Sequence, residues 1–147
     1  MANINEELIA LLNTALELEH AARIQYLAHA QLVKGQGAEK IIERLEEIAS
    51  DEQKHEQKYR DLIGNYLGGV PSMKMSATKP AKDLNEILVI NRKDEREAID
   101  IYKKIYQKII ASKDSLLYTF ETLEHEVRHI IIEEQEHASE LSVLLGE

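Results

Sequence analysis

The chain has 147 residues, of which 44% are hydrophobic and 31% charged, with a formal charge of −9 and no cysteine. This length and apolar content predict one globular domain, residues 1–147, with an ample core and no room for a second domain. The charge disfavours nucleic acid and anionic membranes as partners, and the lack of cysteine excludes disulfides, iron–sulfur clusters and thiolate zinc sites.

The first half of the chain is typical of two long helices and a loop. A capping-box pattern at Asn3 predicts a helix over residues 3–34, which ends before the glycines of residues 35–37. Residues 38–67 predict a second helix, and both helices carry apolar stripes at spacings of three and four. Residues 68–82 are rich in Gly, Pro, Ser and Lys. In an extended conformation this segment is long enough to run alongside a long helix.

The second half repeats this pattern. Another capping box at Asp83 predicts a helix to about Ala111, and a short turn over residues 112–114 leads into a last helix that reaches the C-terminus. Two short connections and one long central one predict an all-α four-helix bundle with a crossover between its second and third helices. No signal peptide or membrane span is apparent, so we expect a cytoplasmic protein.

Each apolar stripe is interrupted by acidic residues that should point inward. Glu52 and His55, like Glu134 and His137, lie three apart, so that both side chains of a pair share one helix face and can bind one ion. A carboxylate on a core-facing position is costly unless it is paired or bound to metal. The four stripes together predict a dinuclear metal site. Its predicted ligands are Glu19, Glu52, His55, Glu95, Glu134 and His137.

The two halves also repeat each other, since each supplies one lone Glu and one Glu-x-x-His. This set resembles the ferritin-like di-iron carboxylate proteins, in which two helices each give a Glu and two others each give a Glu-x-x-His. Within this class the chain is most similar to bacterioferritin. The similarity lies in Gln25 and Tyr26 after Glu19, in Asp51 and Glu52 with His55 and Tyr59, and in Glu95.

The resemblance implies two iron ions, with manganese or zinc as alternatives. It implies that Glu52 and Glu134 bridge the two ions, and that Tyr26 is a catalytic residue beside them. The implied terminal ligands are Glu19 with His55 and Glu95 with His137.

The chain departs from bacterioferritin in two places. Gln53 stands where that family has a methionine that ligates a haem shared by two subunits, so we expect no haem. The chain ends ten residues after His137, so we expect no short fifth helix of the kind found in ferritin cages. A homodimer is predicted through the first two helices, because the first helix is apolar well beyond its ligand stripe, and a larger cage is the alternative. The apolar flanks predicted to support it are Ile9, Leu16, Ile24 and Leu27, and Leu11 and Leu18.

The site and the resemblance together predict a ferroxidase that oxidises Fe²⁺ with O₂ or H₂O₂ in iron handling. The alternatives are a rubrerythrin-like peroxidase, a manganese catalase or a small-substrate oxygenase on the same scaffold, and a non-catalytic metal-binding bundle. Other ligand-type side chains lie off the core stripes. We expect His20, His29, His125 and His129 at the surface or its boundary, with an accessory metal role as the alternative, and Asp51 and Glu47 on a charged helix face or an iron route.

Overall fold

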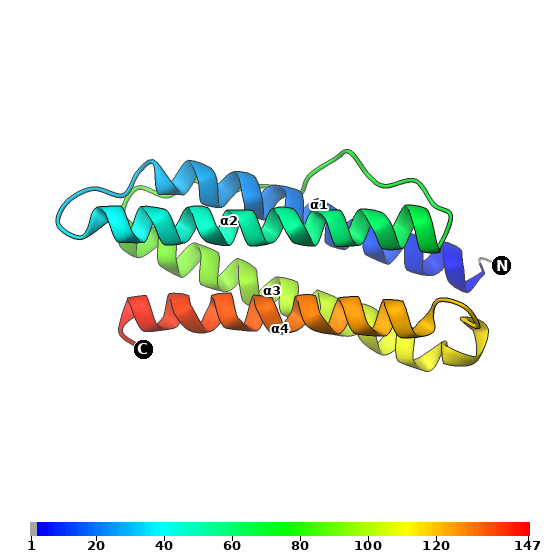
Figure 1. The fold of residues 1–147 in the computed structure, drawn as a ribbon. Helices are drawn as coiled ribbons and strands as arrows, with labels where there is room; N and C mark the ends of the chain where they lie inside the picture. Colours follow the sequence, from blue (N-terminus) through cyan, green and yellow to red (C-terminus); the bar gives the residue numbers. More distant parts are fainter. Residues whose placement is uncertain (1–2) are drawn as a thin grey trace.

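The structure is a computed structural model that describes residues 3–147; the first two residues of the predicted domain lie outside the described part. The described residues form four long helices and no strand, which confirms the predicted all-α bundle (Figure 1). The first two helices form one antiparallel pair and the last two another, and an extended crossover along α1 connects the pairs over the length of the bundle. The helices are α1 (Ile4–Ala30), α2 (Ala38–Asp61), α3 (Leu84–Ala111) and α4 (Phe120–Leu145).

Both predicted N-terminal caps are confirmed. The Asn3 side chain accepts the N–H of Glu6 at 2.9 Å, and the Asp83 side chain accepts the N–H of Glu86 at the same distance. Each bond satisfies a backbone donor that has no partner within the helix, which favours helix formation from that residue onward. None of the helices in residues 3–147 is long and apolar enough to cross a membrane.

Two predicted helix boundaries are wrong. The first helix ends at Ala30, four residues early, because the next residues form tighter turns, although Val33 remains buried. The last helix begins at Phe120, since Lys113–Ser115 form the 3₁₀ helix η2. Leu116 is buried although it precedes the helix. The spacing of apolar residues indicates which side chains face the core. It does not show where the α-helix ends, because a turn before or after the helix can keep the same spacing.

The second helix continues into a single π-helical turn, η1 (Leu62–Tyr66), before the crossover. Two glycines then let the chain turn back over the first helix. Gly68 has a φ of +72°, which favours glycine, and a Cβ on Gly69 would lie 2.8 Å from Ile9. The start of the predicted crossover is therefore set by backbone conformation at one glycine and by close packing at the other.

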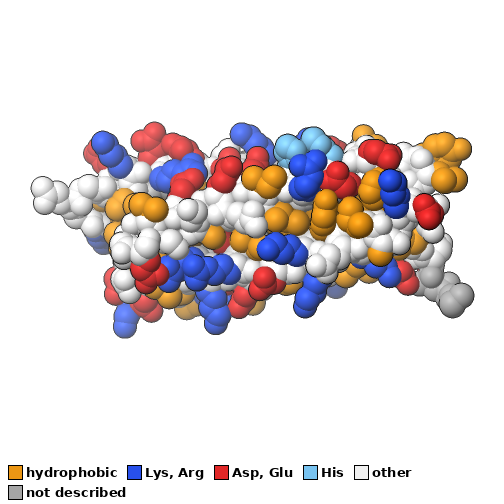
Figure 2. Space-filling model, turned by 90° about the horizontal axis from the view of Figure 1, so that it is seen from below, with side chains coloured by type: hydrophobic (Ala, Val, Ile, Leu, Met, Phe, Trp, Pro, Cys, Tyr) orange, Lys and Arg blue, Asp and Glu red, His pale blue; other side chains and the backbone are white. Residues whose placement is uncertain are grey.

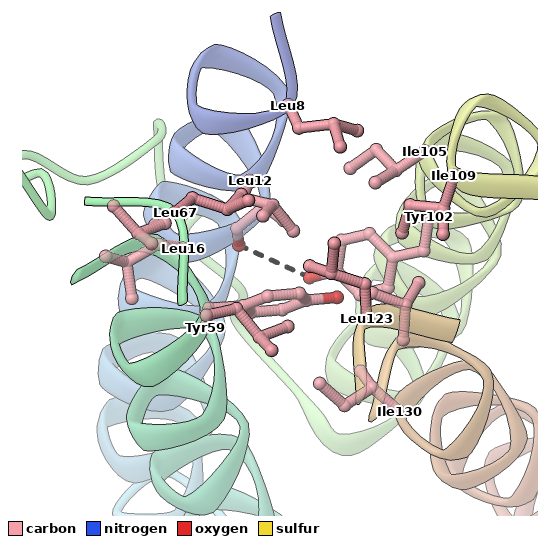
Figure 3. Close-up of a cluster of buried hydrophobic side chains, with 14 of the residues drawn as sticks. Leu8, Leu12, Leu16, Tyr59, Leu67, Tyr102, Ile105, Ile109, Leu123 and Ile130 are labelled. Carbon is pink, nitrogen blue, oxygen red and sulfur yellow. Dashed lines mark hydrogen bonds between the residues drawn. The ribbon is translucent and has the colours of Figure 1, made fainter. Parts of the chain in front are cut away.

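Two apolar clusters fill the bundle on either side of its middle. In the larger one, shown in Figure 3, the rings of Tyr59 and Tyr102 meet edge to face with centroids 5.4 Å apart. The smaller cluster packs Tyr26, Ile48 and Ile87 near the other end. Along α1, α2 and α3 the predicted ligands lie between these clusters, and along α4 they lie between the larger cluster and buried Leu141. Apolar side chains therefore flank the middle of the bundle on both sides.

The apolar flanks predicted for the first helix are only partly exposed. Leu16 is fully buried in the larger cluster, and Ile9 packs against that cluster as a half-buried side chain. Ile24 and Leu27 are each 40% exposed. The outward apolar surface of α1 is thus smaller than its sequence predicts, because α2, α3 and the crossover cover its other side chains.

Candidate dinuclear metal site

Six ligand-type side chains from all four helices meet in the middle of the bundle. Each is at most 3% exposed, which is rare for carboxylates without a compensating partner. They form two groups whose ligand atoms lie within 4.8 Å of one another. One group holds Glu19, Glu52, His55 and Glu134, and the other holds Glu52, Glu95, Glu134 and His137.

Glu52 and Glu134 belong to both groups, which is the arrangement expected of carboxylates that bridge two ions. The His55 Nδ1 atom lies 3.1 Å from a Glu134 oxygen and 3.4 Å from a Glu52 oxygen. His137 Nδ1 lies 3.4 Å from an oxygen of each of the same two glutamates. The two halves of the chain therefore place equivalent donor atoms around two adjacent candidate metal positions.

The inward atoms of this cluster have no hydrogen-bond partner among the described residues, although they are buried. Buried carboxylate oxygens without partners cost several kcal/mol each unless a proton or a cation compensates them. Oxygen and imidazole donors together suit Fe, Mn or Zn, and two divalent ions would balance four carboxylates. The donor set thus fits the predicted pair of metal ions. The atoms without partners are Glu19 Oε1, both oxygens of Glu52, His55 Nδ1, Glu95 Oε2, Glu134 Oε1 and His137 Nδ1.

Burial and mutual repulsion raise the pKa of every carboxyl group in the cluster. Burial, with the charge of Glu134, raises the pKa of Glu19 to about 7 and that of Glu95 to about 8. Burial and repulsion from Glu19 and Glu52, respectively, also raise the pKa values of Glu52 and Glu134. Without metal, Glu19 and Glu95 therefore hold protons up to about neutral pH, and a bound metal ion would displace these protons.

The pKa values of the two histidines are raised, although burial by itself lowers them. Burial lowers the pKa of His55, but the carboxylates of Glu19, Glu133 and Glu134 outweigh it and raise that pKa. His137 behaves in the same way, because the nearby carboxylates of Glu134, Glu52 and Glu95 outweigh burial and raise its pKa. Without metal the imidazoles thus carry positive charge that partly neutralises the cluster, and bound metal ions would take the place of this charge.

The outward nitrogen of each histidine is held by an acidic residue from the other Glu-x-x-His helix. His137 Nε2 donates to Asp51 at 2.9 Å, and His55 Nε2 donates to Glu133. This bond directs the Nδ1 lone pair of the neutral imidazole toward the cluster and fixes the ring. Glu133 was not predicted, yet the signal was available, because an acidic residue directly precedes the Glu of both motifs, at Asp51 and Glu133.

Replacing Asp51 by Ala is expected to weaken metal binding at the His137 side by roughly tenfold or more, because the ring loses its orienting acceptor. The exposed neighbour Gln53 provides the matched control, since Gln53→Ala removes a polar side chain from the same helix without touching His137. Equilibrium dialysis against Zn²⁺ measures the change. Equal affinities in the two variants would show that the hydrogen bond does not orient a ligand.

Two tyrosines donate to the lone glutamates in a symmetric way. The Tyr26 hydroxyl donates to Glu95 at 2.8 Å, and the Tyr102 hydroxyl donates to Glu19 at 2.6 Å. Tyr26 therefore lies where the resemblance predicts it, beside the cluster. A catalytic role was predicted for Tyr26 alone, although Tyr102 follows Glu95 by seven residues just as Tyr26 follows Glu19.

A cavity of about 60 Å³ lies beside the carboxylates and is lined by Glu19, Glu52, Glu95 and Tyr26. It extends to the crossover, whose Ser76, Ala77 and Lys79 form part of its wall. This space holds a few water molecules or a diatomic molecule, and an organic substrate would not fit without movement of the crossover. The cavity therefore admits only small molecules as it stands.

The crossover is fixed over this cavity at Lys79. The Lys79 N–H donates to Gln25 at 2.7 Å, its carbonyl accepts from His29 Nε2 at 2.8 Å, and its ammonium group donates to Asp94 at 2.8 Å. Asn91 donates to His29 Nδ1, which assigns the ring proton to Nε2. His29 is only 3% exposed, so its predicted place at the surface or its boundary is wrong, because the crossover covers it.

The other off-stripe residues lie outside the cluster. His20 is half buried, with its Nδ1 2.6 Å from the Lys74 carbonyl, while His125 and His129 are exposed as predicted. Glu47 pairs with Arg44 on the surface of α2.

Four helices that enclose a carboxylate and histidine cluster of this composition define the class of dinuclear carboxylate bundles. The family model of the ferritin-like domain matches residues 9–147. The chain belongs to the ferritin-like family.

Its relatives agree with the bacterioferritin resemblance. Bacterial ferritins of Neisseria meningitidis and Neisseria gonorrhoeae are 31% identical over 101 residues, or 68% of this chain, which spans only 64% of their length. A solved ferritin-like diiron-carboxylate protein from Bacillus anthracis is 30% identical, covers 99% of both chains and superposes with a TM-score of 0.88.

Two further solved structures have a similar fold. The bacterioferritin of Rhodobacter capsulatus has a TM-score of 0.83 over 93% of this chain and 82% of its own, and at 23% identity it is evidence for the fold alone. A dodecameric thioferritin from Bacteroides fragilis is 29% identical, with a TM-score of 0.81 over 97% of this chain and 86% of its own. Ferritin-like and diiron-carboxylate relatives, together with the buried cluster, agree with iron as a candidate ligand.

Proposed function

We propose that residues 1–147 form a single ferritin-like di-iron domain that binds two Fe²⁺ ions and oxidises them as a ferroxidase. The predicted ligands hold the ions, with Glu52 and Glu134 shared between them. One observation carries this proposal, namely the two overlapping groups of buried donors whose inward atoms have no partner within the described residues. Two ions held about 3.5–4 Å apart can both deliver electrons to one oxidant.

The proposed reaction balances as a two-electron oxidation. Two Fe²⁺ ions become two Fe³⁺ ions, and the two electrons with two protons reduce O₂ to H₂O₂ or reduce H₂O₂ to two water molecules. Protons that the carboxyl groups and imidazoles hold in the metal-free protein leave as Fe²⁺ enters. Tyr26 and Tyr102 keep Glu95 and Glu19 oriented through their hydroxyl groups, and Tyr26 lines the cavity where the oxidant would lie.

The dimensions of the cavity bear on the alternatives. A space of about 60 Å³ accommodates O₂ or H₂O₂ and disfavours an oxygenase that acts on an organic substrate. A rubrerythrin-like peroxidase or a manganese catalase would use the same small oxidant, and a non-catalytic bundle would use the same ligands. Turnover separates these functions, because a ferroxidase consumes Fe²⁺ in excess of its sites, whereas a peroxidase or catalase consumes H₂O₂ without it.

Stopped-flow absorption after aerobic mixing tests the proposal. The metal-free protein is expected to take up two Fe²⁺ ions per chain and to oxidise them far faster than buffer does, with further additions oxidised in turn. Metal analysis of protein purified without added metal identifies the ion it carries. Binding of two Zn²⁺ ions without Fe²⁺ oxidation or H₂O₂ turnover would refute the ferroxidase and favour the non-catalytic bundle.

We further propose a homodimer that binds no haem and acts in the cytoplasm, with a larger cage as the alternative assembly. Gln53 is exposed on α2 and offers an amide where haem ligation would need a thioether. Ile24, Leu27 and Leu32 are 40–44% exposed along α1 and its end, and this apolar surface supports self-association. A reducing compartment keeps iron as Fe²⁺, which supports a cytoplasmic site of action.

A further inference from the structure

A pair of exposed histidines lies on α4, outside the dinuclear cluster. His125 and His129 are one helical turn apart, and their ring centroids are 4.1 Å apart with the rings inclined by 33°. Both side chains are exposed, and Figure 2 shows a patch of histidine side chains on the face formed by α3 and α4. The two imidazoles therefore extend side by side into solvent from one face of the helix.

The pair begins a row of ligand-type residues that leads into the site. His125, His129, Glu133 and His137 follow one another at intervals of four, and each step turns the side chain by about 40° around the helix. The row therefore passes from exposed His125 and His129 through Glu133, whose side chain is 51% exposed, to buried His137. The Glu133 carboxylate accepts from His55, so it touches a ligand of the cluster directly.

The chemistry of this pair suits a divalent transition metal ion. Two imidazoles at positions i and i+4 of a helix can chelate one such ion, and water can fill its remaining positions. Neighbouring cations are offset by acidic partners, since Lys58 pairs with Glu126 at 3.2 Å and Arg128 with Glu124 at 2.7 Å. Two protein ligands on an exposed helix face form a site from which an ion can also leave, as a transfer step requires.

We propose that His125 and His129 together bind one divalent first-row transition metal ion at the surface of α4, and that Glu133 passes this ion to the dinuclear site. The ion is captured by the two imidazoles, then taken up by the Glu133 carboxylate, and then reaches His55 and the shared glutamates. The identity of the transferred ion as Fe²⁺ rests on the proposed function. Capture at the two imidazoles is independent of the proposed function, because it needs only an ion that binds imidazole.

Equilibrium dialysis against Zn²⁺ tests the capture site. The double variant His125→Ala/His129→Ala is expected to bind one fewer Zn²⁺ ion per chain than the wild type, with the ions of the dinuclear site retained. Gln135→Ala removes an exposed polar side chain from the same helix and is expected to bind as many ions as the wild type. An unchanged number of bound ions in the double variant, with helical content intact by circular dichroism, would overturn the capture site.

Stopped-flow oxidation of Fe²⁺ tests the transfer. With less than one Fe²⁺ per chain, where capture limits the reaction, the double variant is expected to be several-fold slower than the wild type, and the rates should converge when Fe²⁺ is in large excess. Loss of the surface ion without any change in the low-iron rate would overturn the transfer role. If the wild type itself fails to oxidise Fe²⁺, the proposed function fails, while the dialysis result still decides whether the capture site exists.

Discussion

Replacing Glu52 by Ala is expected to abolish rapid Fe²⁺ oxidation while the four-helix bundle stays folded. Glu52 belongs to both ligand groups, so its loss removes one of the two carboxylates that both ions would share. Loss of an outer partner of a ligand costs ~10–100-fold in metal affinity or activity, and loss of a shared ligand should cost at least roughly a hundredfold in rate. Stopped-flow oxidation under matched iron concentrations measures the effect, and Glu134→Ala should behave alike.

The fold should survive this change because its stability comes mainly from the two apolar clusters on either side of the site. Removing Glu52 also relieves repulsion among buried carboxyl groups in the metal-free protein, as the raised pKa of Glu52 indicates. The matched control is Glu46→Ala, the same substitution at an exposed position of α2. If Glu52→Ala and Glu46→Ala oxidised Fe²⁺ at equal rates, the cluster would not be the catalytic centre. The non-catalytic metal-binding bundle would then be the favoured function.

The metal-free protein is expected to lose stability as the pH rises from about 5 to about 8, and divalent metal should remove this loss. The folded pKa values of Glu19 and Glu95, about 7 and about 8, lie above the ordinary value of 4.5. The folded state therefore holds protons that the unfolded chain releases at lower pH. The stabilising contribution is complete below pH 4.5 and disappears as the pH passes through the folded pKa values.

The size of this effect follows from the shifts. One pKa unit corresponds to about 1.4 kcal/mol, so each of these two carboxyl groups contributes on the order of 3 kcal/mol between the ends of the range. The raised pKa values of His55 and His137 act in the same direction above about pH 6.5. The pKa of half-exposed Glu133 is lowered from 4.5, so its contribution changes only below this range and does not oppose the loss. Metal ions replace the protons, so the holo protein should show little of this dependence.

Urea unfolding followed by circular dichroism, in the presence of a chelator, measures the pH dependence. Glu19→Gln keeps the shape of the side chain and removes its titration, so this variant should lose less stability between the two pH values than the wild type does. A surface change with the same loss of charge, Glu46→Gln, serves as the control for the repulsion caused by net negative charge. Stability that increased from pH 5 to pH 8 without metal would contradict the assignment.

The helical bundle and the six candidate ligands could be predicted from the sequence because both depend on one helix at a time. A spacing of three and four assigns each side chain to a face of its own helix, and Glu52 with His55 must share that face whatever packs against it. Costly inward carboxylates on four separate stripes then require a common compensating cation. The structure brings all six side chains together, as this argument requires.

Contacts between helices could be decided only by the tertiary structure. The bonds from His137 to Asp51 and from Tyr102 to Glu19 depend on the axial register of helices that are distant in sequence. The burial of His29 beneath Lys79 depends on the path of the crossover. A helical period assigns a direction around an axis and leaves the position along a neighbouring axis undetermined, because apolar stripes pack with similar free energy at several registers. The sequence thus determined which side chains face the core, and packing decided which of them meet.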